Sequence, residues 1–435
     1  MELRLALVFL LGACIGSLAN LGVYRLAWSP RPIGPWTRPH DKAAPRRWTD
    51  RLPIVGWLGL RRESALHGPG FWIRPMLLEL LLGTGLAALY WWEIGQQGLL
   101  PADAPTLAGR AMLILHAPYA AHLLLISLMV VAAMIDLDER IIPDTITVPG
   151  VWLGLLLAAV CPWALLPEFV PPAAGIARLT YWAGLSPETW QILQPASPEV
   201  VFEGLFPQGH PQPQGIPLFP HPWLLAAGLG CWWLWCVALM PRVWYGRYGW
   251  RRASAYFVAT LVRERATYRI LVMGLIGSAA IVGVWFWGGT HWTGLLAALV
   301  GMAGGGGLIW LVRVTGAVTL RREAMGFGDV TLMAMIGTFL GWQTCLLIFF
   351  IAPLCALLIG VVQLILYRDN MLPYGPFLCA GTLLTIVFWP TLWDRSYHVF
   401  APGWLVPTLI PIFIGLMGIM LGGYAGLRGM LQKGR

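Results

Sequence analysis

Long apolar runs separated by short basic segments dominate the chain. A helix needs about 20 apolar residues to cross the hydrocarbon core of a bilayer, and about eleven runs approach that length. We therefore predict an all-α, polytopic bundle of about eleven transmembrane helices. The predicted spans are residues 4–26, 76–93, 111–135, 146–165, 223–240, 269–288, 293–312, 330–342, 344–366, 373–390 and 404–427.

The composition agrees with a membrane protein. Of the 435 residues, 58% are hydrophobic and only 11% are charged, unlike the mix of a soluble globular domain. The net charge of +9 does not indicate nucleic-acid binding, because Lys and Arg lie in short clusters between apolar runs and form no basic face interleaved with aromatics. The expected partner of the surface is a lipid bilayer.

The charges around the first span predict its orientation. Only Arg4 precedes the apolar run, and Glu2 offsets it, whereas seven basic residues follow. This asymmetry places the N-terminus outside and predicts a retained helix instead of a cleaved signal. The basic residues after the run are Arg25, Arg31, Arg38, Lys42, Arg46, Arg47 and Arg51.

The spans and their connections divide the chain into segments. The stretch 166–222 contains too many prolines for a continuous helix, so we expect an irregular outer loop with one short helix. The seven scattered cysteines indicate small buried side chains, and the run Gly304–Gly307 favours close helix packing over a phosphate loop. The segments are the first helix (1–26), a basic inner loop (27–75), helices bearing the first candidate aspartate (76–165), the Pro-rich outer insertion (166–222), additional helices with a basic inner loop (223–292), helices with the second candidate aspartate (293–390) and a C-terminal helix with a basic tail (391–435).

Two carboxylates beside the spans are the candidate chemistry. Asp329 lies in "AMGFGDVTLM" and Asp136 in "MIDLDERIIPDTIT", each at a helix end on the predicted inner side. A charge at a membrane span is costly and suggests function. Two such groups brought together cannot both ionise easily, which suits peptide hydrolysis by a general base and a general acid. Gly326 and Gly328 would let the backbone approach a bound peptide or the partner aspartate.

These residues resemble a known family. "GFGDVTLMAMIGTFLGW" resembles the GxGD region of type IV prepilin peptidases, and so, in family order, do "GSLANLGVYRL", "LPIVGWLGLR" followed by "IRPMLLELLLG", "IDLDERIIPDTIT" and "LPYGPFLCAG". The resemblance implies an eight-helix core with additional spans. It also implies a bacterial inner-membrane enzyme that removes the basic leader of type IV prepilins or pseudopilins at the cytoplasmic face. Matched residue by residue, the family's catalytic aspartates are Asp136 and Asp329, with acid and base not assigned between them.

Three further acidic residues are candidates for supporting roles. Asp144 would cap the fourth span or contact substrate, and Asp138 would be solvated, pair with Arg140 or tune the site. Glu79 matches the family's acid in the second span, and a functional role and a helix-packing role are equally expected. For His116 and His122 we expect interhelical hydrogen bonds, because their spacing is poor for ligating one metal.

The chain departs from the family in the first inner loop. Many members carry two CxxC pairs there, a spacing that suits zinc, but this loop has no cysteine, and we predict no structural zinc. N-methylation from S-adenosylmethionine, which many members perform, is in doubt for the same reason. Thr331 stands where a Lys is common, so a cation that could steady the pair is missing from that position.

Two other classes of protein compete with the peptidase. One is a catalytically silent scaffold of a pilus or secretion machine that binds the leader without cleaving it. The other is an ion-coupled transporter, which the sequence disfavours because transporters place charged groups near the membrane midplane on broken or repeated helices.

Overall fold

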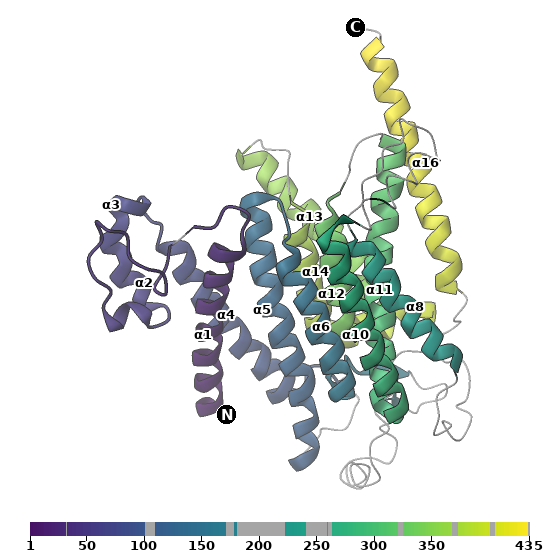
Figure 1. Cartoon of the computed structure of the whole chain (residues 1–435), viewed down its shortest axis with the longest axis horizontal. Coiled ribbons are helices and arrows are strands. Elements are labelled where there is room, and N and C mark those ends of the chain that lie inside the picture. The colour runs from purple at the N-terminus through teal and green to yellow at the C-terminus, as the bar shows by residue number, and fades with distance from the viewer. Residues whose placement is uncertain are drawn as a thin grey trace.

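The computed structural model describes residues 1–31, 33–100, 109–170, 178–180, 222–240, 259, 263–320, 325–367, 373–400 and 405–433. Most of the predicted outer loop and most of the predicted inner loop 241–268 lie outside these residues. The described part is a bundle of helices (Figure 1). Its only strands are β1 (Glu168–Val170) and β2 (Arg178–Thr180), an antiparallel pair that the sequence did not predict.

Every predicted span is occupied by a helix, which confirms the all-α, polytopic class. The helices are α1 (Glu2–Leu26), α4 (Ile73–Tyr90), α5 (His116–Glu139), α6 (Asp144–Val160), α8 (Pro222–Leu239), α10 (Arg265–Trp287), α11 (Gly289–Leu320), α12 (Phe327–Leu340), α13 (Trp342–Tyr367), α14 (Gly375–Val387) and α16 (Leu405–Lys433). Short π or 3-10 turns adjoin them at η3 (Trp91–Gly95), η4 (Gly109–Leu115) and η5 (Pro162–Ala164).

Not all of these helices are long enough to cross a bilayer by themselves. Six described helices meet a length and composition test for spanning, or seven if the bent pair α14–α15 counts as one. The count of about eleven is therefore not reached by this test. Helix α12 shows the reason: its 14 residues extend only about 21 Å at 1.5 Å per residue. The two chain termini lie at opposite ends of the bundle (Figure 1).

An additional short helix, α15 (Trp389–Phe400), follows α14 at an angle of 86°. The sequence analysis assigned this stretch no helix of its own. Helix α15 buries Trp389, Trp393 and Phe400, and the Trp389 Nε1–H donates a hydrogen bond to the Pro167 carbonyl at 2.5 Å. The buried aromatic face explains why this polar stretch is helical, since packing supplies what local sequence does not.

Glycines allow α11 and α12 to pack at close range. A Cβ on Gly301 would lie 2.0 Å from the Gly337 carbonyl oxygen, and one on Gly305 would lie 2.8 Å from the Met333 carbonyl oxygen. Small residues that let backbones approach are typical of helix pairs in membranes. The interpretation of the Gly304–Gly307 run as a packing surface is confirmed at Gly305.

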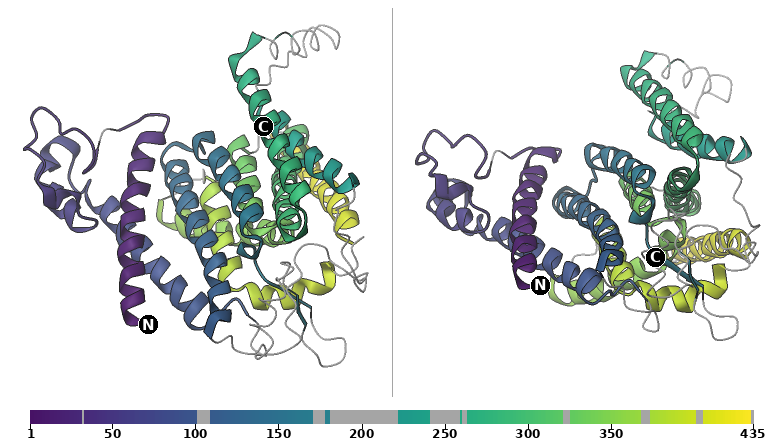
Figure 2. Two further views of the ribbon diagram at one scale, coloured as in Figure 1. Left: turned by 60° about the horizontal axis from the view of Figure 1, so that its bottom comes forward. Right: turned by 90° about the horizontal axis from the view of Figure 1, so that it is seen from below.

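The first inner loop folds into a small lobe at one edge of the bundle, beyond α1 and α4 (Figure 2). Its elements are η1 (Trp48–Arg51), α2 (Val55–Leu60), η2 (Arg61–Glu63) and α3 (Ser64–His67). Ion pairs cross-link the lobe: Arg62 binds Asp50 through both of its terminal nitrogens, and Arg46 pairs with Glu63. The hydrogen bonds from Arg62 hold the pKa of Asp50 below its usual range.

Candidate active site

The structure brings Asp136 and Asp329 together from two helices. Asp136 lies in the last turn of α5 and is 5% exposed, and Asp329 lies in the first turn of α12 and is 7% exposed. The segments that carry them meet at Ile142: a Cβ on Gly328, next to Asp329, would lie 2.8 Å from the Ile142 Cβ, and one on Gly375, which contacts Asp136, would lie 2.9 Å from the Ile142 Cδ1. Two acidic groups from distant parts of the sequence therefore share one buried site.

A third helix, α14, meets Asp136 with its N-terminus. The Gly375 backbone N–H donates a hydrogen bond to Asp136 Oδ2 at 3.1 Å, and a helix N-terminus favours a negative charge. A Cβ on residue 375 would lie 2.6 Å from the same oxygen and 2.9 Å from Ile142 Cδ1. Only glycine lets α14 approach this closely.

Asp329 is held by the turn that precedes it. Gly326 is the N-cap of α12 with extended backbone angles (φ −69°, ψ 155°), and a Cβ there would lie 3.7 Å from Asp329 Oδ2. Asp329 thus occupies the third helical position, from which an acidic side chain reaches back to the cap. At Gly328 a Cβ would lie 2.8 Å from the Cβ of Ile142, in the segment after Asp136. Gly328 therefore lets the start of α12 approach the segment that follows Asp136.

The pair has no cationic partner in the described part of the chain, where none of the ion pairs involves Asp136 or Asp329. Two neighbouring carboxyl groups in a poorly solvated site share a proton, since ionising both would place like charges side by side. Such a pair can hold a water molecule between a base and an acid. That is the chemistry of amide hydrolysis.

Glu79 has a different environment from the pair. It is fully buried and accepts hydrogen bonds from Trp57 Nε1 at 2.8 Å, Asn20 Nδ2 at 3.2 Å and the Ile54 backbone N–H at 2.5 Å. These donors come from the lobe and from α1, so Glu79 fastens the lobe to the membrane helices. None of its hydrogen bonds goes to Asp136 or Asp329, and the geometry favours the packing role.

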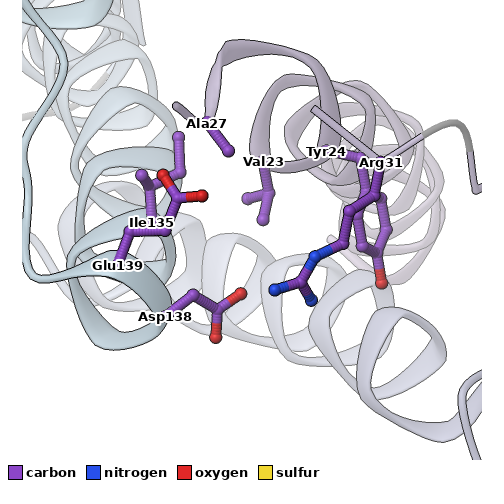
Figure 3. A pocket seen from close by; sticks show the side chains of 7 residues that line it. All are labelled: Val23, Tyr24, Ala27, Arg31, Ile135, Asp138 and Glu139. Carbon is purple, nitrogen blue, oxygen red and sulfur yellow. The ribbon is translucent and has the colours of Figure 1, made fainter. Parts of the chain in front are cut away.

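Asp138 also joins the lobe region to α5. Its Oδ1 pairs with Arg74 at 2.6 Å, a partner that the sequence did not indicate, while the neighbouring Glu139 accepts hydrogen bonds from the backbone N–H groups of Trp28 and Ser29. Asp138 and Arg31 point toward one another across a small pocket (Figure 3). The pocket lies on a different face of α5 from Asp136. It is lined by Val23, Tyr24, Ala27, Arg31, Ile135, Asp138 and Glu139.

Asp144 does not cap α6. It is the first helical residue, Pro143 occupies the cap position, and no side chain makes a capping hydrogen bond. The capping prediction is therefore wrong by one position. An acidic residue in the first turn still interacts favourably with the helix dipole, which explains its place there.

The two histidines of α5 make the interhelical hydrogen bonds that the sequence predicted. His122 Nδ1 lies 2.6 Å from Glu93 Oε1, with both side chains fully buried, and His116 Nε2 lies 3.2 Å from the Tyr90 hydroxyl. These contacts connect α5 to α4 and the π-helical turn η3.

Sequence analysis missed the residues that complete the site. Gly375 and Ile142 belong to the motifs "LPYGPF" and "RIIPD", but neither was assigned a role. The signal for Gly375 is a Gly-Pro pair opening an apolar run, which is a pattern of helix starts. Its contact with Asp136 depends on packing between helices far apart in the chain.

Comparisons with known proteins identify a family and several relatives that this chain resembles. The type IV leader peptidase family matches residues 123–192 and 257–361, which include both aspartates. A prepilin leader peptidase/N-methyltransferase of Myxococcus xanthus is 30% identical over 154 residues, 35% of this chain and 39% of that protein. One from Klebsiella pneumoniae is 29% identical over 189 residues, 40% of this chain and 72% of that protein. One from Burkholderia pseudomallei is 31% identical over 123 residues, 27% of this chain and 38% of that protein.

No solved structure matches the chain. The fold defines a polytopic helical membrane protein, with two buried carboxylic acids at one end of its helices. The family match and these relatives show that the chain is similar to prepilin leader peptidases. The match spans about two fifths of the Myxococcus relative.

Proposed function

We propose that the chain is a membrane aspartyl endopeptidase that removes the basic leader of type IV prepilins or pseudopilins. The observation that carries the proposal is the buried pair of Asp136 and Asp329, which lacks a cationic partner among the described residues. The family match over both aspartates supports it, as do the relatives' names.

In the proposed reaction one carboxylate of the pair accepts a proton from a water molecule as that water attacks the scissile carbonyl carbon. The other, protonated carboxyl group donates its proton to the carbonyl oxygen, which gives a tetrahedral gem-diol. As the C–N bond breaks, the first aspartate passes the proton that it took from water to the leaving nitrogen, and a gem-diol hydroxyl returns its proton to the second aspartate, which restores the starting pair. The Gly375 N–H and the turn at Gly326 keep the two carboxyl groups in place. The pair acts as one titrating unit, and either aspartate can be the base.

The contacts between the lobe and α5 support a cytoplasmic location for the reaction. The basic lobe is fastened to the end of α5 that carries Asp136, through the Arg74–Asp138 ion pair and the Glu139 hydrogen bonds. Basic segments remain on the inner side of bacterial membranes. We therefore place the site at the cytoplasmic face of the bacterial inner membrane.

Methylation is not part of the proposed reaction. The relatives are named N-methyltransferases as well, and S-adenosylmethionine would supply the methyl group there. However, Asp50 and Glu63 in the described lobe bind arginines, and Glu79 of α4 accepts hydrogen bonds from the lobe, so protein donors already engage these acidic groups. We derive no methylation step, and no described group of three His, Cys, Asp or Glu residues fits a zinc site.

Mass spectrometry of a pilin substrate tests the proposal. Purified protein in detergent should cleave a pilin that carries a basic leader, and the product mass reports N-methylation in the same measurement. Binding of the leader without cleavage by the wild-type protein would favour the scaffold. Ion flux in proteoliposomes without cleavage would favour the transporter.

A further inference from the structure

The turn that carries Asp329 is supported from a neighbouring helix. Arg313 lies near the end of α11, which packs along α12, and its side chain is half-buried. Its Nε–H donates a hydrogen bond to the Met325 carbonyl at 3.0 Å. Its guanidinium group lies over the ring of Phe327, 5.8 Å from the ring centroid. Arg313 therefore contacts the residues on both sides of Gly326.

Gly326 is the N-cap of α12 and lies against the Asp329 carboxyl group, since a Cβ on Gly326 would lie 3.7 Å from Asp329 Oδ2. Fixing Met325 and Phe327 fixes the orientation of the peptide between them, and with it the carboxyl group that this peptide holds. A hydrogen bond to a charged donor and a cation–π contact are each stronger than a neutral contact at a half-buried site. The Arg313 side chain therefore restrains the turn at two points, the Met325 carbonyl group and the Phe327 ring.

Position 331 cannot provide this support. Thr331 is fully buried, and its hydroxyl donates a hydrogen bond to the Gly328 carbonyl at 3.0 Å. The cation near the turn comes instead from α11.

We propose that Arg313 is a positioning residue that holds the Met325–Phe327 turn, and through it the Asp329 carboxyl group, in the geometry for hydrolysis. The inference rests on the proposed function. Arg313 contacts Met325 and Phe327, on either side of Gly326, and its effect on Asp329 passes through this turn.

Two substitutions separate geometry from charge. Arg313→Lys keeps the positive charge but loses the Nε–H donor and the planar group over Phe327, and Arg313→Gln loses the charge as well. Misplacing a reacting group by about 1 Å costs up to about 100-fold in rate. We expect both variants to lower kcat for leader cleavage about 10- to 100-fold, with KM changed less than about 3-fold. The shape of the pH profile of kcat should remain that of the wild type.

The matched control is Arg265→Lys, at an exposed arginine that opens α10. Hydrogen exchange over residues 325–331 gives a readout that needs no substrate: it should accelerate in Arg313→Lys and remain unchanged in Arg265→Lys. Phe327→Leu is a second variant that should lower kcat and be non-additive with Arg313→Lys. A folded Arg313→Lys variant with wild-type kcat and wild-type exchange overturns the inference. If the wild-type protein itself fails to cleave, the proposed function has failed, and the exchange result still decides whether Arg313 holds the turn.

Discussion

The acidic groups of the lobe and those of the candidate active site are buried to similar extents but differ in their partners. Asp50 and Glu63 in the lobe bind arginines, whereas Asp136 accepts a hydrogen bond from the Gly375 backbone and neither Asp136 nor Asp329 takes part in an ion pair among the described residues. Paired charges hold a segment together, because each ion satisfies the other's hydrogen-bonding capacity. Carboxyl groups without a counter-charge beside a membrane are costly and are available for chemistry. The presence or absence of an arginine partner distinguishes carboxylates that stabilise the structure from those that can react.

The largest expected effect comes from the pair itself. Asp136→Asn and Asp329→Asn should each reduce cleavage by at least about 10²- to 10⁴-fold, because each removes one partner of the acid–base pair. Cleavage of a pilin substrate in detergent is the measurement, and Asp394→Asn at an exposed position of α15 is the control. Full activity in either variant would contradict the pair.

The next effect tests the contact between α14 and Asp136. Gly375→Ala places a Cβ 2.6 Å from Asp136 Oδ2, so the carboxyl group or the helix must shift. We expect kcat to fall about 10- to 100-fold. Gly85→Ala in α4 is the matched control, since a Cβ there has no atom within 4 Å, and it should retain wild-type cleavage. Equal rates for the two variants would show that the Gly375 contact does not orient Asp136.

Glu79 should affect the lobe more than the reaction. Glu79→Gln replaces one accepting oxygen by a donor that faces other donors, which costs about 1–3 kcal/mol. Trypsin should then cleave the lobe at least about 5-fold faster, while leader cleavage changes less than the Gly375→Ala variant does. Glu2→Gln, at an exposed residue, provides the comparison. If Glu79→Gln lost as much leader cleavage as Asp136→Asn while the lobe still resisted trypsin, Glu79 would have a role in the reaction.

The ion pair of Asp50 should have a smaller effect. Asp50→Asn weakens both hydrogen bonds from Arg62, which is itself 25% exposed and partly screened by solvent. We expect a loss of about 1 kcal/mol in the opening free energy of the lobe, measured by hydrogen exchange of residues 47–63. Unchanged exchange would mean that this ion pair does not stabilise the lobe.

The smallest effect is a pH dependence of the lobe. Because Arg62 lowers the pKa of Asp50 in the folded state, its stabilisation is complete above the ordinary aspartate pKa of about 3.9 and is lost as the pH falls through the lower folded value. Exchange protection that is specific to Asp50 should therefore be constant at neutral pH and decline below about pH 4. Asp50→Asn should lack that decline. An identical acid profile in both proteins would contradict the assignment.

The sequence by itself determined the membrane class, the helix positions and the two candidate aspartates. Apolar runs fix where helices form, because burial in lipid dominates every other preference of those segments. A charged residue beside such a run is conspicuous, which is why Asp136 and Asp329 could be found without coordinates.

Only the tertiary structure decided which groups surround those aspartates and which acids have structural partners. The Gly375 contact with Asp136, the Arg313 support of the Asp329 turn and the Arg74–Asp138 ion pair all join residues on separate helices or segments. Such contacts depend on how close two helices approach and how each is rotated. The pattern within one segment does not determine the distance between two helices or their rotation. Both depend on how glycines and buried polar groups of the two helices fit together.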